Sequence, residues 1–384
     1  MRIDSRTVIT GALLSGAILI YIVSLVGWRQ GALFLVGIGA GLILYHAAFG
    51  FTSAWRDMIS KGRGAGLRAQ MIMLAITAIV FLPLLADGQL WGMELRGSVR
   101  PLSVSVIAGA FLFGVGMQLG GGCASGTLFT AGGGNTRMVL TLVAFIVGSA
   151  LGAYHLPAWQ AAPGFGPVSL LGQFGLGLAL VISLVLFASV WLGSAFVERR
   201  RYGALEKNAT CFATGSWLRG PWPLVAGAVG LAGVNIATLT LAGRPWGVTS
   251  GFALWGSKVA AALGFNVAAW PYWQGPATSA ALEASVFSDI TSVMNFGIIL
   301  GALMAAGLAG RFAPIWRVPW RSLLAAIAGG LLLGYGARIA YGCNIGAYFS
   351  GISSSSLHGW LWFVAALVGN GLGAKLRPAF GLSN

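Results

Sequence analysis

The stretch GVGMQLGGGCASGTLF, residues 114–129, returns in altered form as GYGARIAYGCNIGAYF, residues 334–349. At an offset of 220 positions (123 to 343), six residues coincide in type. They are Gly114, Gly116, Gly122, Cys123, Gly126 and Phe129, which match Gly334, Gly336, Gly342, Cys343, Gly346 and Phe349. The agreement indicates a duplicated chain that keeps one thiol at two equivalent places. A single buried cysteine is usually a small packing residue, and five matched neighbours weaken that explanation here.

The composition is that of a membrane protein. Of the 384 residues, 57% are hydrophobic and only 8% are charged, with a mean hydropathy of +0.84. A soluble globule cannot bury that much apolar surface. The 60 glycines suit closely packed helices and breaks of the chain inside the membrane.

Ten apolar runs are long enough to cross a bilayer, which takes about 17 to 25 helical residues. The predicted spans are 8–27, 31–50, 69–86, 102–120, 137–156, 167–195, 222–241, 290–309, 321–341 and 357–376. Four shorter stretches are predicted not to cross: 51–60, 122–131, 249–265 and 343–352. The first run lacks an A-x-A cleavage site, so we expect a retained helix and not a cleaved signal. The predicted fold class is an all-α polytopic membrane protein with short re-entrant helices.

The duplication extends beyond the cysteines. FGFTSAW at 49–55 resembles WGVTSGF at 246–252, which pairs Gly50 with Gly247. VAFIVGSALGA, from Val143, resembles VAALVGNGLGA, from Val364, after a slip of one residue. The expected organisation is an N-terminal helix at 1–30, a first repeat at 31–156, a connecting helix and basic linker at 157–221, and a second repeat at 222–377.

The positive charges predict how the halves are oriented. Five cations crowd the linker, and cytoplasmic loops are the ones enriched in Lys and Arg; they are Arg199, Arg200, Arg201, Lys207 and Arg219. Counting spans from a cytoplasmic linker places both termini in the cytoplasm. The same count places the matching loops 87–101 and 311–321 on opposite faces, so the repeat is predicted to be inverted.

Inverted repeats with interrupted helices bring matching breaks to the bilayer midplane, where secondary transporters bind their substrates. Irregular backbone at that depth must be buried in protein or line a watery cavity. Short helices beginning near each cysteine would aim their positive ends at the centre and favour an anion, at a midplane site without fixed charge. Arg338 lies within an apolar span where the first half has Gln118, so it is either a pathway residue or a side chain reaching to the interface. The predicted pathway residues are Cys123, Cys343, Gly122, Gly126, Gly342, Gly346, Gly50, Gly247 and Arg338.

Several other classes of function are not supported. Three cysteines without a C-x-x-C pair and three histidines suggest neither a disulfide framework nor a zinc site. A Walker A sequence is absent, and the net charge of +15 reflects cytoplasmic loops, not a nucleic-acid surface. We therefore expect a transporter and not an enzyme, with no cofactor, no metal and no nucleic-acid partner, surrounded by membrane lipid.

Three segments, RPWGVTSGFALWGSKV, GYGARIAYGCNIGAYFSGISSSSLHGWLWF and GMQLGGGCASGTLF, resemble the signature segments of the YeeE/YedE family of bacterial inner-membrane transporters for thiosulfate and related compounds. The resemblance covers about 31 to 377. It implies an hourglass-shaped helical protein in which Cys123 and Cys343 hand thiosulfate along at a narrow waist. It also implies a cytosolic sulfur carrier of the TusA type as partner. A further family cysteine is replaced here by Gly50, in FGFTSAWRD, and Cys211 lies in the linker.

Other functions remain open at this stage. With two thiols in place of three, the substrate could be sulfite, a selenium compound or a persulfide. A transmembrane thiol–disulfide relay between Cys123 and Cys343 is a second class, provided that their Cα atoms come within about 7 Å. A small-anion channel with incidental thiols is a third.

Overall fold

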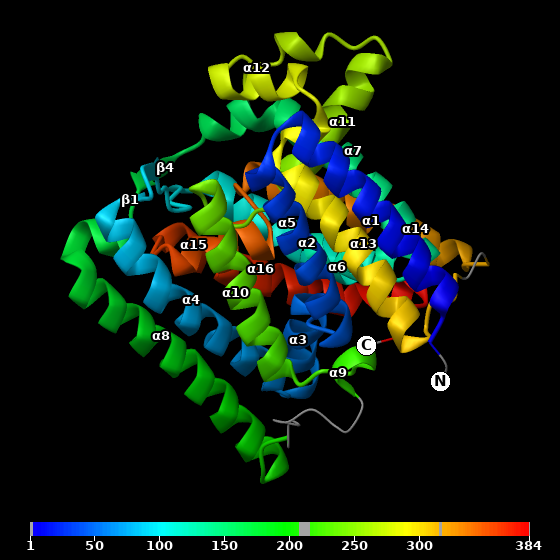
Figure 1. Cartoon of the computed structure of the whole chain (residues 1–384). Coiled ribbons are helices and arrows are strands. Elements are labelled where there is room, and N and C mark those ends of the chain that lie inside the picture. The colour runs from blue at the N-terminus through cyan, green and yellow to red at the C-terminus, as the bar shows by residue number, and fades with distance from the viewer. Residues whose placement is uncertain (1–2, 207–215, 315–316, 384) are drawn as a thin grey trace.

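The computed structural model describes residues 3–206, 216–314 and 317–383 (Figure 1). Within these ranges, ten helical segments are long and apolar enough to cross a membrane. They are Ser5–Leu25, Trp28–Lys61, Ala65–Asp87, Val104–Gly132, Thr136–Gln160, Leu170–Tyr202, Leu224–Ala242, Ile290–Ala309, Trp320–Ser353 and Leu357–Phe380. Each of the ten predicted spans overlaps one of these segments, and the chain is a multi-pass membrane protein. Three of the segments, Trp28–Lys61, Val104–Gly132 and Trp320–Ser353, also include a short helix that follows the predicted span.

Ten long helices form the body of the molecule. They are α1 (Ser5–Leu25), α2 (Trp28–His46), α4 (Ala65–Asp87), α5 (Val104–Gly120), α7 (Thr136–Gln160), α8 (Leu170–Tyr202), α10 (Leu224–Ala242), α13 (Ile290–Ala309), α14 (Trp320–Ile339) and α16 (Leu357–Leu376). The four stretches predicted not to cross are short helices: α3 (Phe51–Arg56) with the π-helix η1 (Asp57–Lys61), α6 (Ala124–Gly132), α11 (Thr249–Ala262), and the π-helix η5 (Asn344–Phe349) with α15 (Ser350–Ser353).

The remaining described elements are small. They are the strands β1 (Gln89–Leu90), β2 (Met93–Glu94), β3 (Pro101–Ser103) and β4 (Gly164–Pro167), the helices α9 (Ser216–Arg219) and α12 (Pro276–Glu283), and the 3₁₀ turns η2 (Val267–Ala269), η3 (Pro271–Trp273), η4 (Val286–Ser288) and η6 (Arg377–Phe380). The strands pair only as β1–β2 and β3–β4, so the all-α class is confirmed. The folded segment 263–289 between α11 and α13 was not foreseen, because its residues lack a clear helical period.

Polar side chains fix where several long helices begin. Ser103, Asn135 and Asp289 each accept a hydrogen bond from a backbone N–H of the first turn that follows, at α5, α7 and α13 respectively. Such caps satisfy N–H groups that have no partner within the helix. These three caps therefore stabilise the starts of α5, α7 and α13.

Glycines let the long helices approach closely. α7 packs along α14, and α5 packs along both α14 and α16. α2 packs along α13, and α4 along α10. A methyl group on Gly114 would collide with the carbonyl of Ala366 on α16, and one on Gly334 would collide with the carbonyl of Phe145 on α7. Small residues at these crossings give helices in lipid the contact area that holds them together.

A buried carboxylate joins α8 to the bundle. Glu198 accepts hydrogen bonds from Arg68 Nη1 at 2.8 Å, from Gly64 N at 3.0 Å and from Glu206 N at 2.8 Å, and its side chain is fully buried. Arg63 pairs with the same carboxylate at 3.4 Å. Four donors compensate one charge, which is the condition for burying it.

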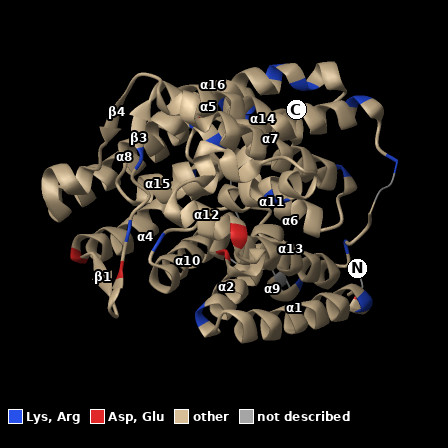
Figure 2. Cartoon of the chain, turned by 90° about the horizontal axis from the view of Figure 1, so that it is seen from above, with Lys and Arg blue, Asp and Glu red and all other residues tan. Residues whose placement is uncertain are grey.

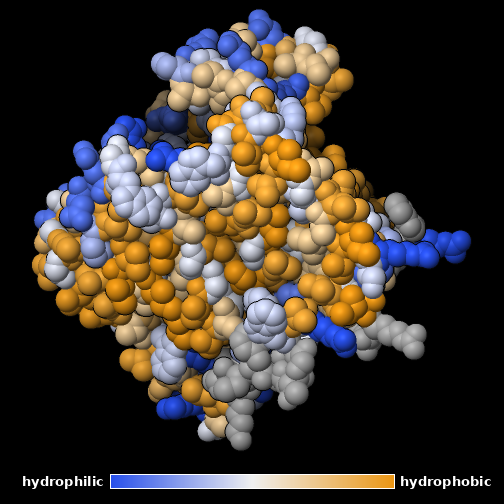
Figure 3. Space-filling view, in the orientation of Figure 1, coloured by the Kyte–Doolittle hydropathy of each residue, from blue (hydrophilic) through white to orange (hydrophobic). Residues whose placement is uncertain are grey.

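The surface divides into polar ends and an apolar belt. Both termini and α9 lie at one end of the molecule, and α12 lies at the other (Figure 1). Seen from the α12 side, Lys and Arg are spread over loops and helix ends, while the acidic residues in sight lie near β1 and near α12 (Figure 2). Apolar residues form a broad band between the two polar ends (Figure 3). Lys207 and Cys211 of the linker lie outside the described residues.

Candidate functional site

The two cysteine turns have the same local geometry. Cys123 has an extended backbone (φ −82°, ψ −170°) immediately before α6, and its Sγ accepts from Gly126 N at 3.4 Å. Cys343 has φ −106° and ψ −167° immediately before η5, and its Sγ accepts from Ile345 N at 3.4 Å. A short helix therefore begins at each cysteine, as the sequence predicts, and each thiol caps its helix.

The fold brings both thiols into one buried core. The exposed fraction is 2% for Cys123 and zero for Cys343, and both are free thiols. They belong to the same cluster of buried residues, in which α6 contacts η5. Near Cys123, the Ser125 hydroxyl lies 3.4 Å from Sγ. Among the described residues, no three His, Cys, Asp or Glu side chains gather in the manner of a metal site.

A cavity of about 690 Å³ opens on the α12 side and reaches the second cysteine turn; we call it the arginine cavity. Gly342 and Gly346, on either side of Cys343, line it. Gly247 and the segment 271–278 line other parts of its wall. Four cations also line it, namely Arg96, Arg100, Arg244 and Arg338. The approach to Cys343 is therefore strongly positive.

Most of this positive charge has no acidic partner. Arg96 pairs with Glu94 at 2.8 Å, but no described carboxylate pairs with Arg100, Arg244 or Arg338. Desolvation in the cavity, followed by repulsion from Arg338, lowers the pKa of Arg100. Unpaired guanidinium groups in a partly desolvated cavity favour binding of an anion.

Arg338 is held in place by packing and by a phenol. Its exposed fraction is 8%, and its Nη1 donates to the hydroxyl of Tyr272, from η3. The guanidinium carbon lies 5.3 Å from the centre of the Tyr272 ring. Gly152 of α7 leaves room for the stem of Arg338, since a methyl group there would lie 2.7 Å from Arg338 Cβ. Arg338 is thus a cavity residue whose side chain is more than nine-tenths buried.

A second cavity, of about 500 Å³, lies at the far end of α6; we call it the distal cavity. Thr130, Gly133 and Gly134 line it together with Arg137 and Arg311, the latter just beyond the end of α13. Since α6 begins after Cys123 and spans about 12 Å at 1.5 Å per residue, it connects the first cysteine turn to this cavity.

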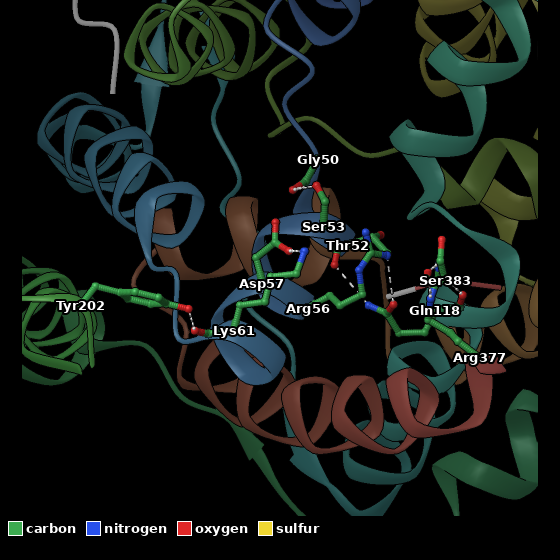
Figure 4. Close-up of polar contacts among 10 residues, drawn as sticks. All are labelled: Gly50, Thr52, Ser53, Arg56, Asp57, Lys61, Gln118, Tyr202, Arg377 and Ser383. Carbon is green, nitrogen blue, oxygen red and sulfur yellow. Dashed lines mark hydrogen bonds and ion pairs between the residues drawn. The ribbon is translucent and has the colours of Figure 1, made fainter. Parts of the chain in front are cut away.

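The first-half counterpart of Arg338 is tied into a polar cluster (Figure 4). Gln118 Nε2 donates to Thr52 O at 3.1 Å, and Gln118 Oε1 accepts from Arg56 Nη1 at 3.4 Å. Arg377 Nη1 donates to Gln118 O at 2.7 Å. Gly50 precedes α3 in the same region, where its carbonyl accepts from Ser53 Oγ at 3.2 Å.

The structure therefore gathers part of the predicted set. Gly342, Gly346, Gly247 and Arg338 line the arginine cavity, and Cys343 is fully buried in the chain between Gly342 and Gly346. Cys123, Gly122 and Gly126 meet at the turn that contacts η5. Gly50 lies apart from the arginine cavity, at the start of α3.

Sequence reasoning missed four residues of the arginine cavity: Arg100, Arg244, Tyr272 and Tyr341. The four arginines of this cavity are fixed charges, which the predicted midplane anion site lacks, and that midplane site stays a prediction. Tyr341 had a signal in the sequence. It stands where the first repeat has Gly121, and it adopts the same left-handed conformation (φ +59°), which costs a non-glycine residue about 1 kcal/mol.

The fold defines the chain as a multi-pass membrane protein, and comparison with known proteins gives its class as a transporter. The model of the Sulphur transport family matches residues 46–372. The chain is 30% identical over 355 residues to the thiosulfate transporter TsuA of Spirochaeta thermophila, an overlap that covers 88% of this chain and 95% of that protein. It is 24% identical over 352 residues to the thiosulfate transporter TsuA of Escherichia coli, covering 86% of this chain and 89% of that protein. It is 32% identical over 170 residues to the probable transporter YedE of Escherichia coli, covering 43% of this chain and 41% of that protein. The chain belongs to the Sulphur transport family, the YeeE/YedE proteins, and is a transporter and not an enzyme.

Proposed function

We propose that this protein takes up thiosulfate, or a closely related small sulfur-containing anion, along a path lined by Cys343 and Cys123. The observation that carries the proposal is the position of Cys343, whose neighbours Gly342 and Gly346 line a cavity with unpaired arginines. The names of the two TsuA relatives support thiosulfate as the substrate.

The chemistry of the path fits an anion with a soft terminal sulfur. The arginines attract the dianion into the cavity, and a thiol then offers only a weak S–H donor. An arginine at the narrowest point would bind a dianion strongly, whereas weak contacts let it leave. From Cys343 the anion passes to Cys123 and leaves along α6 to the distal cavity, where Arg137 and Arg311 receive it.

We further propose that residues 31–156 and 222–377 form an inverted repeat around this path. The helix contacts support it, because exchanging the halves turns one contact into another. α7 with α14 becomes α16 with α5, and α2 with α13 becomes α10 with α4. By the distribution of cations, the arginine cavity faces the outside, and both termini lie in the cytoplasm of a bacterial cell, with the body in the inner membrane. A TusA-type carrier would receive the sulfur compound on the cytoplasmic side.

Uptake of labelled thiosulfate into proteoliposomes tests the proposal. We compare wild type with Cys123→Ala and Cys343→Ala, and add sulfite, sulfate or selenite as competitors. We expect each substitution to abolish uptake and sulfate to compete poorly, since it lacks a terminal sulfur. Normal uptake by both variants would refute the thiol pathway, and stronger competition by sulfite or selenite would reassign the substrate.

The contact of α6 with η5 favours a second candidate, a thiol–disulfide relay. In that reaction two electrons and two protons pass from the dithiol of Cys123 and Cys343 to the disulfide of a thioredoxin-like partner. The redox state of the purified protein separates the two functions. A Cys123–Cys343 disulfide that such a partner forms and reduces reversibly would support the relay, and stable free thiols during thiosulfate uptake would exclude it.

A further inference from the structure

The two cysteine turns differ at positions that the duplication leaves otherwise alike. The turn before each cysteine contains a residue in the left-handed conformation, Gly121 with φ +91° in the first half and Tyr341 with φ +59° in the second. Glycine adopts this conformation without strain, whereas tyrosine does not. Strained residues persist where their side chains serve a purpose, and the side chain of Tyr341 lines the arginine cavity.

Two further differences add polar groups to the second turn. Arg338 replaces Gln118, and Asn344 replaces Ala124. Arg338 lines the cavity while more than nine-tenths buried, and its Nε is buried without a hydrogen-bond partner. Asn344 is fully buried next to Cys343, and neither atom of its amide has a partner among the described residues. Such groups are costly to leave unpaired in a folded protein, so they point to a ligand.

The donors match the oxygen end of a sulfur oxyanion. A guanidinium, a phenolic O–H and an amide NH₂ all donate to oxygen, and the guanidinium adds charge. A terminal sulfur accepts hydrogen bonds weakly, so these groups do not compete with Cys343 for it. The first turn has neither the guanidinium nor the phenol, and the amide of Gln118 is already bonded to Thr52 O and Arg56 Nη1.

We propose that Arg338, Tyr341 and Asn344 form an oxyanion-recognition set that determines substrate specificity at the second cysteine turn. The set binds the oxygens of the entering anion and leaves its sulfur facing Cys343. The first cysteine turn contacts the sulfur without binding the oxygens. The second turn therefore selects the anion, and the first turn releases it. The inference rests on the transport function proposed above and specifies which groups choose the substrate.

The repeat itself supplies the test variants. Arg338→Gln, Tyr341→Gly and Asn344→Ala each install the residue of the first turn, whose backbone already accommodates it. Tyr341→Phe removes the hydroxyl alone. Ala340→Gly is the matched control, because it is the same kind of exchange, with Gly120, at a residue whose side chain has no polar group. Thermal unfolding of each purified variant shows whether it is folded.

The readout is the KM for labelled thiosulfate in proteoliposomes, with hydrosulfide, which has no oxygen, as a competitor. We expect KM to rise about tenfold or more in Arg338→Gln and about threefold in Tyr341→Phe and Asn344→Ala. Half-inhibition by hydrosulfide should change less than twofold, and Ala340→Gly should match wild type.

The outcomes separate this inference from the proposed function. A KM within twofold of wild type in both Arg338→Gln and Tyr341→Phe would overturn the recognition set while leaving thiosulfate transport intact. Equal weakening of hydrosulfide and thiosulfate would also overturn it, because the loss would then reflect general charge or folding. Absence of thiosulfate uptake by the wild-type protein would overturn both proposals.

Discussion

Gly50→Cys tests whether a thiol can be added to the path where the family resemblance implies one. Gly50 has an extended backbone (φ −101°, ψ 115°), which cysteine adopts freely. The new Cβ would lie 2.5 Å from Ser53 Oγ and otherwise meets only ordinary contacts. Because a hydroxyl at the end of a side chain can rotate away, the fold can accept the substitution.

The expected change in stability is small. Rotation of Ser53 loses its 3.2 Å hydrogen bond to Gly50 O, which costs about 1 kcal/mol. Replacing glycine makes the unfolded chain less flexible, which raises the free energy of unfolding by about 0.5–1 kcal/mol. The two terms nearly cancel, so the free energy of unfolding should change by less than about 1 kcal/mol.

The assay is thiosulfate uptake together with thermal unfolding. Gly39→Cys is the matched control, since a Cβ there meets no atom within 4 Å and Gly39 lines neither cavity. We expect Gly50→Cys to leave uptake intact or raise it. A loss of uptake at unchanged stability would refute the reasoning. Uptake would then require that position 50 has no side chain, and Gly50 would not simply occupy the place of a lost cysteine.

Three structural predictions concern the scaffold. Gly114→Ala forces a methyl group against the Ala366 carbonyl, so we expect it to destabilise the protein by about 1–3 kcal/mol and to lower the temperature of thermal unfolding. In the control, Gly39→Ala, the methyl group meets no atom within 4 Å and the unfolding temperature should not change. Equal unfolding temperatures of the two variants would contradict the packing argument. Glu198→Gln leaves the charge of Arg68 uncompensated, so we expect the free energy of unfolding to fall by about 3 kcal/mol, measured again by thermal unfolding. A change as small as that of a surface substitution would be inconsistent with a buried charge pair. Lys258 Nζ donates hydrogen bonds to two carbonyl oxygens of segment 263–289, at 2.6 and 2.8 Å. Lys258→Met removes these bonds, so chymotrypsin should cut the segment faster than it does in wild type. Unchanged cleavage would show that other contacts hold the segment in place.

The sequence predicts most of the architecture because lipid leaves few choices. Spans must be long and apolar, so composition and length alone locate all ten. The four short helices follow from stretches too short to cross. Segment 263–289 was missed, since its turns depend on contacts such as Trp273 with Ser257, which a pattern does not reveal.

The candidate site divides in the same way. The duplicated stretch by itself determined that two thiols occupy equivalent turns, because a shared pattern of glycines dictates a shared backbone path. Only the tertiary structure decided what surrounds each thiol. Four separate segments of the chain supply the residues that meet around one cavity, namely Arg100, Arg244, Tyr272 and Arg338. Their positions in the sequence do not indicate that they are neighbours in the folded protein. The backbone path of a cysteine turn depends on neighbouring residues in the sequence. The charge near that turn depends on segments that are distant in the sequence and come together only when the helices pack.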